Sequence, residues 1–155
     1  MISFTDHEAI TRQVYLYGYG MDQQDWEGYR QLFDDEVVVD YSSYSGGEPE
    51  VVATEQWIAR LQSLFPGLDA TQHSMTNPLV DLADDGDTAR CRMYVRAAHF
   101  LNDWPEPEFT IGGYYDHRLR RTPDGWRFRE VKLIVWWRRG DPELMVEARR
   151  RAAAA

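Results

Sequence analysis

Four long strand-like segments, joined by short connections, fill the second half of the sequence. They cover roughly residues 71–82, 88–101, 109–121 and 126–138, and the connections include DDGD and TPDG. Strands joined by tight turns pair in antiparallel order, and Asp124-Gly125 is a typical hairpin signal. The chain therefore predicts a mainly antiparallel sheet as its central element.

A helical pattern opens the chain. Apolar residues Ile10, Val14, Tyr17 and Met21 recur at helical spacing after TDHE, a capping box in which Thr5 is expected to cap the helix. Gly18 and Gly20 lie inside this segment, where glycine weakens a helix but lets a neighbouring element approach closely.

Three further segments complete the first half, and a helix follows the sheet. A short helix is expected from near Asp25, a strand in EVVVDYSSY with Tyr41 on its apolar face, and a third helix capped by Thr54. Residues from about 141 predict a C-terminal helix with Pro142 in its first turn.

This order predicts an α+β fold, with a curved, mainly antiparallel sheet wrapped by N-terminal helices. Such a sheet forms a cone with an internal pocket. At 155 residues, the chain is expected to form one domain over residues 1–155.

Net charge and cysteine content limit which ligands and partners the chain is expected to bind. The formal net charge of -9 disfavours nucleic acid, which such a field repels. Cys91 is the only cysteine, which rules out an internal disulfide, and no close-spaced metal-ligand motif or cofactor fingerprint is present. We expect a cytoplasmic protein that uses no metal and no cofactor and contacts no membrane, because no segment reaches roughly 18 apolar residues.

Strand alternation places histidines on the inner face of the sheet. His99 shares the apolar face of its strand with Met93, and His73 shares a face with Met75 and Asn77. Tyr115 and His117 lie on the corresponding face of the next strand. Histidine transfers protons near neutral pH, although a histidine on an apolar face is more often a satisfied core residue.

The chain resembles the SnoaL-like and scytalone dehydratase-like family, which also includes ketosteroid isomerase and polyketide cyclases. The resemblance covers roughly residues 5–140 and rests on YGYGMDQQDWEGYRQLFDDEVVVDY, on TQH at 71–73 and on RAAH at 96–99. It implies that Asp22 pairs with His73, that His99 is a second active-site imidazole, and that Tyr41 holds a water or a substrate carbonyl. By itself, Asp22 near a helix end is equally read as a capping or solvated residue.

This chain departs from the dehydratase pattern at three positions. Met21 replaces a tyrosine before the aspartate, and Gly113 and Tyr115 replace a serine and an asparagine on a later strand. The groups expected to bind substrate are therefore particular to this chain: Tyr19, Trp57, Met75, Asn77, Met93, Tyr115 and Trp137.

The resemblance implies a cofactor-independent lyase of the dehydratase type, acting on a small hydroxylated carbonyl or polyketide-like compound. The same dyad serves an isomerase or a polyketide cyclase, which remain alternatives. A non-catalytic small-molecule-binding protein, or the small subunit of a ring dioxygenase, is a third. Relatives of this fold form dimers or trimers, and apolar residues on the outer sheet face (Tyr94, Phe100 and Trp136) favour a homo-oligomer.

Overall fold

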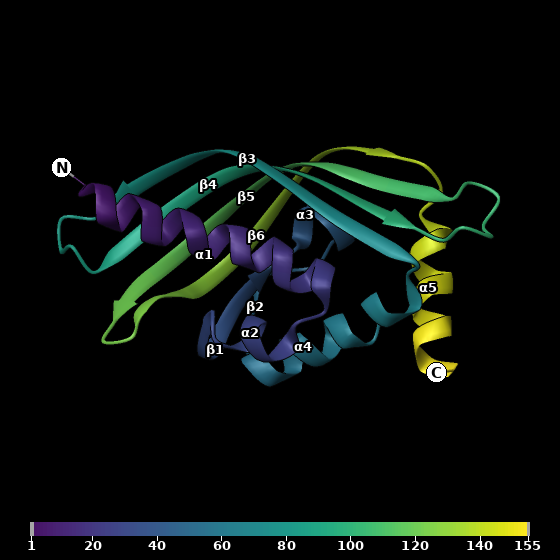
Figure 1. Ribbon diagram of the computed structural model, residues 1–155, viewed down its shortest axis with the longest axis horizontal. Helices are drawn as coiled ribbons and strands as arrows, with labels where there is room; N and C mark the ends of the chain where they lie inside the picture. Colours follow the sequence, from purple (N-terminus) through teal and green to yellow (C-terminus); the bar gives the residue numbers. More distant parts are fainter. Residues whose placement is uncertain (1, 155) are drawn as a thin grey trace.

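A computed structural model describes residues 2–154, which contain one curved sheet of six strands (Figure 1). The strands are β1 (Phe33–Asp40), β2 (Glu50–Ala53), β3 (Ala70–Leu82), β4 (Thr88–Phe100), β5 (Glu108–Thr122) and β6 (Gly125–Arg139). Their order is β2-β1-β6-β5-β4-β3, and every neighbouring pair is antiparallel except β1 and β6. The predicted α+β class with a mainly antiparallel sheet is confirmed.

Helices cover one side of this sheet. They are α1 (Phe4–Gln23), α2 (Trp26–Arg30), α3 (Ser42–Ser45), α4 (Thr54–Gln62), the 3-10 helix η1 (Phe65–Gly67) and α5 (Glu143–Ala154). Figure 1 shows α1 running along the sheet near β3 and β4, α4 near β1 and β2, and α5 beyond the far end of the long strands. No described helix is both long and apolar enough to cross a membrane.

The N-cap of helix α1 lies two residues before the predicted one. Ser3, not Thr5, is the N-cap, and its side chain accepts a hydrogen bond from the Asp6 backbone N–H at 3.0 Å. The helix ends where Gln24 adopts a left-handed conformation with φ 53° and its N–H bonds back to Gly20 and Met21. The predicted apolar stripe is confirmed, because Ile10, Val14, Tyr17 and Met21 are all buried.

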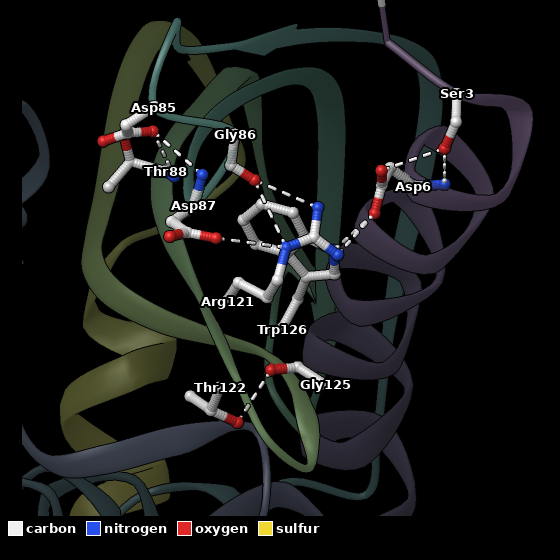
Figure 2. Close-up of polar contacts among 10 residues, drawn as sticks. All are labelled: Ser3, Asp6, Asp85, Gly86, Asp87, Thr88, Arg121, Thr122, Gly125 and Trp126. Atoms are coloured by element: carbon white, nitrogen blue, oxygen red, sulfur yellow. Dashed lines mark hydrogen bonds and ion pairs between the residues drawn. The ribbon is translucent and has the colours of Figure 1, made fainter.

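Arg121 fixes the first turn of α1 to two turns of the sheet (Figure 2). Its guanidinium lies 2.9 Å from the Asp6 carboxylate and donates to the carbonyl of Gly86 at 3.0 and 3.2 Å. It also stacks over the Trp126 ring at 4.6 Å. The first turn of α1, the β3–β4 turn and the β5–β6 hairpin are thereby joined. Asp22 lies near the other end of α1, roughly 24 Å along the helix from Asp6.

Two predicted boundaries in the first half are wrong. Strand β1 ends at Asp40, because the Asp40 carboxylate accepts from the backbone N–H and the hydroxyl of Ser42 and turns the chain into α3. Tyr41 is therefore the N-cap residue just before α3, not a strand residue. Thr54 does not cap α4; it is the first helical residue, and its hydroxyl donates to the carbonyl of Asp34 at 2.6 Å.

The outer face of the sheet carries an exposed aromatic cluster. Trp136 is 60% exposed and Tyr94 is 51% exposed, and their ring centroids lie 5.6 Å apart. Tyr114 also packs against Trp136, with 5.2 Å between the ring centroids. Self-association as a dimer or trimer stays a prediction, and this cluster is the face on which it rests.

Helix α5 is held against η1 by a close backbone approach. A Cβ atom built at Gly67 would overlap the carbonyl oxygen of Ala148, so this position accepts only glycine without movement of α5. Leu144 and Ala148 are fully buried at the same junction. The position of α5 matters for function, because Met145 and Arg149 of this helix line a cavity.

We expect Gly67→Ala to lower the free energy of unfolding by about 1–3 kcal/mol, the usual cost of forcing extra volume into a packed contact. Urea unfolding followed by tryptophan fluorescence measures the change. A variant as stable as the parent chain would contradict the tight junction between η1 and α5.

Candidate active site

A cavity of about 350 Å³ lies between the concave face of the sheet and the helices. Its inner wall carries two imidazoles and two phenols, and its outer wall carries residues of α3, α4 and α5. The polar inner residues are His73, His99, Tyr41 and Tyr115. Trp57, Phe65, Met21 and Leu133 supply apolar surface between them.

The carboxylate of Asp22 holds His73 at two points. One oxygen lies 2.7 Å from Nδ1 of the His73 ring, and the other accepts from the His73 backbone N–H at 2.7 Å. An ionised carboxylate only accepts hydrogen bonds, so Nδ1 carries the proton. Nε2 lies on the other side of the ring and is the nitrogen left without a bond to Asp22.

Gly18 brings α1 close enough to β3 for this contact. A Cβ atom at Gly18 would lie 2.6 Å from the sulfur of Met75 and 3.0 Å from Cβ of His73. The expected role of glycine in this helix, the close approach of a neighbour, is confirmed at this position. Asp22 follows one helical turn later on the same face, so the close packing at Gly18 also brings the Asp22 carboxylate within hydrogen-bonding distance of His73.

His99 is held in a neutral form. Its Nδ1 lies 3.2 Å from the carbonyl oxygen of Phe109, which only accepts, so this nitrogen also carries the ring proton. Burial, with a smaller contribution from neighbouring His73, lowers the pKa of His99 from 6.5 to about 4. The ring therefore offers an acceptor at Nε2 near neutral pH. Its centroid lies 6.0 Å from that of His73.

Four tyrosines cluster beside the cavity: Tyr17, Tyr29 and Tyr115 are buried, and Tyr41 is half-buried. The hydroxyls of Tyr17 and Tyr41 lie 2.7 Å apart, and Trp57 donates to the Tyr29 hydroxyl at 3.3 Å. Burial raises the pKa of all four tyrosines, including Tyr115, well above the ordinary value. They remain protonated donors at neutral pH, and Tyr41 and Tyr115 reach the cavity.

His117 is not part of the cavity wall. It is fully buried, stacks on Tyr115 at a centroid distance of 4.7 Å, and accepts at Nδ1 from the Lys132 backbone N–H at 3.3 Å. Burial lowers its pKa from 6.5 to about 3. Its position agrees with the structural role favoured by the sequence.

The structure groups some of the candidate residues and separates others. His73, His99, Tyr41, Trp57 and Tyr115 line the cavity, and Asp22 lies directly behind His73. Five expected substrate-binding residues lie elsewhere: Tyr19, Met75, Asn77, Met93 and Trp137.

The position of each of these five residues has a structural reason. Tyr19 faces outward from α1 and is 61% exposed, and Met75 packs under Gly18. Asn77 has a left-handed φ of 59° at an irregularity in β3, which ends the inward alternation that begins at Thr71. Met93 is core, and Trp137 covers Gly112 while remaining 45% exposed.

Sequence reasoning missed parts of the wall. Phe65 of η1 stacks on His73 at 6.3 Å, and Tyr17, taken only as core, is hydrogen-bonded to Tyr41. Met145 and Arg149 of α5 also line the cavity, and their spacing of four residues is the only sequence signal that they share a helix face. Within residues 2–154, no three His, Cys, Asp or Glu side chains gather closely enough to hold a metal ion.

The chain belongs to the SnoaL-like family, whose domain model matches residues 3–132. An uncharacterized protein of Mycobacterium tuberculosis is 28% identical over 124 residues, which span 79% of this chain and 80% of the relative. The crystal structure of the Kfla4162 protein from Kribbella flavida is similar with a TM-score of 0.83 and 28% identity, covering 94% of this chain and 97% of the other. The sequence-based family resemblance is thus confirmed.

A third similar structure is a scytalone dehydratase-like protein from Novosphingobium aromaticivorans. Its TM-score is 0.75 and its sequence identity 20%, with 87% of each chain covered. At this identity the likeness concerns the fold.

The two buried histidines predict how stability depends on pH. Both have a folded-state pKa below the ordinary value of 6.5, so the unfolded chain binds more protons between pH 5 and 7 and stability falls as the solution is acidified. Each ring is expected to contribute a loss of roughly 2 kcal/mol between those limits. Urea unfolding at several pH values measures this loss.

The matched variant is His117→Phe, which keeps a ring in the aromatic stack. We expect it to remove about half of the pH dependence, whatever its effect on stability at pH 7. A pH dependence equal to that of the parent chain would show that His117 does not titrate on unfolding as its burial requires.

Proposed function

We propose that this protein is a cofactor-independent lyase of the dehydratase type, which removes water from a small hydroxylated carbonyl or polyketide-like compound. The observation that carries the proposal is the pair of hydrogen bonds that His73 donates to the Asp22 carboxylate beside a cavity. A cavity that only binds a ligand has little need for an oriented base. The fold shared with a scytalone dehydratase-like protein supports the same class.

His73 is the base in this proposal. With Nδ1–H bonded to Asp22, the lone pair of Nε2 accepts a proton from the carbon next to the substrate carbonyl. The ionised Asp22 stabilises the imidazolium that results and keeps the ring from rotating.

Tyr41 and Tyr115 bind the carbonyl oxygen. Because burial raises the pKa of both phenols, they enter the reaction as donors and stabilise the negative charge that develops on that oxygen. Tyr17 supports Tyr41 from behind through the 2.7 Å contact between their hydroxyls. The surrounding apolar residues limit access of water to the enolate.

The environment of His99 decides which of two roles it takes in this reaction, protonating the departing hydroxyl or holding it. A neutral ring whose one proton is bonded to Phe109 has no proton to give, so His99 is not the acid that protonates the departing hydroxyl. We assign it instead to accept a hydrogen bond from that hydroxyl and hold it in place. The proton taken by His73 then returns to the hydroxyl, so a C–H and a C–O bond break, a C=C bond forms, and water leaves.

The same groups support a second outcome. When the substrate has no leaving group, return of the proton to another carbon gives an isomerase, and attack of the enolate on a second carbonyl gives a cyclase. A non-catalytic binding protein, or a small subunit of a ring dioxygenase, is the alternative that does without the base.

The test is incubation of the chain with a panel of cyclic β-hydroxyketones, followed by mass spectrometry in water and in deuterium oxide. We expect loss of water that His73→Ala reduces by about 10²- to 10⁴-fold. His7→Ala is the matched control, because His7 lies in the first turns of α1, away from the cavity, and we expect full activity.

The products separate the alternatives. Unchanged mass with His73-dependent deuterium uptake would assign an isomerase or cyclase. If a compound measurably binds but shows no turnover and no deuterium exchange, that result would contradict catalysis and favour the non-catalytic binding protein.

A further inference from the structure

Arg149 is a free cationic group at the edge of the cavity. It lies on α5 and lines the cavity together with Met145 of the preceding turn. Its guanidinium donates to the hydroxyl of Ser63 at 3.1 Å, and among the described residues no carboxylate lies within 4.0 Å of it. A guanidinium has five N–H donors, so most of them remain available for a ligand.

The neighbouring arginines on α5 show that this is not a general feature of the helix. Arg150 donates to the Glu147 carboxylate through Nε and Nη2, each at 2.7 Å. Arg151 bonds Glu147 at 3.0 Å and Asp103 at 2.7 Å. Of these three consecutive arginines, the one that faces the cavity is the one without an acidic partner.

Tyr44 and Arg149 both line this cavity, Tyr44 from α3 and Arg149 from α5. The positive charges of Arg138 and Arg149 act on the Tyr44 hydroxyl and oppose the rise in its pKa that burial causes. A phenol and a guanidinium that converge in this way form a donor set suited to a carboxylate.

The acidic residues of this edge leave Arg149 free. Arg60 pairs with both oxygens of Glu50, which neutralises that carboxylate. Glu48 lines the cavity from the exposed loop between α3 and β2 and forms no ion pair with Arg149. In a chain with a net charge of -9, an anionic ligand is repelled on approach and needs a local cation to be bound.

We propose that Arg149, with Tyr44, binds a carboxylate on the substrate at the end opposite to the carbon on which His73 acts. The proposed substrate is then narrowed to a cyclic hydroxyketone that carries a carboxylate. The proposal rests on the proposed function for the reacting end, while the binding of the carboxylate is independent of turnover.

The test is calorimetric binding of 2-naphthoate and of its neutral counterpart 2-naphthamide, a pair of similar size and shape. We expect the carboxylate to bind more tightly than the amide. We expect Arg149→Met to weaken binding of 2-naphthoate by about tenfold or more and to leave 2-naphthamide unchanged. Arg149→Lys keeps the charge but loses the planar fork of the guanidinium. We expect its affinity for 2-naphthoate to lie between those of the parent chain and Arg149→Met.

The control is Arg150→Met, which removes the same charge from the next residue of α5, where it is engaged by Glu147. We expect it to leave both affinities unchanged, and circular dichroism checks that each variant is folded. Equal weakening of both probes by Arg149→Met, no weakening at all, or no binding of 2-naphthoate to the parent chain would each overturn the proposal.

Two measurements together separate the two proposals: the binding titrations, repeated in a His73→Ala background, and the turnover of hydroxyketones by the parent chain and by Arg149→Met. A carboxylate preference that depends on Arg149, without turnover of any hydroxyketone, keeps this site and rejects the lyase. Turnover of neutral hydroxyketones that Arg149→Met does not alter keeps the lyase and rejects this site.

Discussion

The contact between Asp22 and His73 is the constraint on which the remaining geometry depends. The carboxylate bonds the ring and the backbone of the same residue, so it fixes the position of β3 relative to α1 as well as the orientation of the imidazole. Both the close approach at Gly18 and the Arg121 cluster at the other end of α1 serve this placement. The site is thus a property of the packing between one helix and one edge strand.

Burial then determines the charge state of the groups around this contact. His99 has a pKa near 4, and the tyrosine cluster has pKa values above the ordinary range, because desolvation disfavours the charged forms. The inner wall therefore presents neutral donors and neutral acceptors. In the proposed reaction, such a wall binds a carbonyl and a hydroxyl without charge of its own, and proton transfer is left to His73, the imidazole whose partner is a carboxylate.

The sequence predicts the strand faces well because a strand has a simple two-residue period. His99, Ile111, Tyr115 and His117 are all buried on the faces that the alternation assigns. The pattern fails at Asn77, where an irregularity with a left-handed residue changes the face of β3. The family resemblance, and not periodicity, supplied the pairing of Asp22 with His73.

Other parts of the site depend on tertiary contacts that no local pattern encodes. Tyr41 reaches the cavity from the start of α3, because Asp40 and Ser42 end the strand early. Arg149 reaches it because α5 packs on η1 at Gly67, and that contact joins segments about eighty residues apart. Exposed aromatic residues such as Tyr19 and Trp137 look like binding groups in the sequence and differ from Trp57 only in where their elements lie.

The central claim is that Asp22 holds His73 with its proton on Nδ1 and a free lone pair on Nε2. Nitrogen-15 NMR of the imidazole rings at neutral pH reads this tautomer directly, with His73→Gln used to assign the signal and Asp22→Asn as the comparison. The account predicts a His73 ring that is protonated at Nδ1 in the parent chain and mixes tautomers in Asp22→Asn. A proton on Nε2 in the parent chain, or a tautomer that Asp22→Asn leaves unchanged, would contradict it.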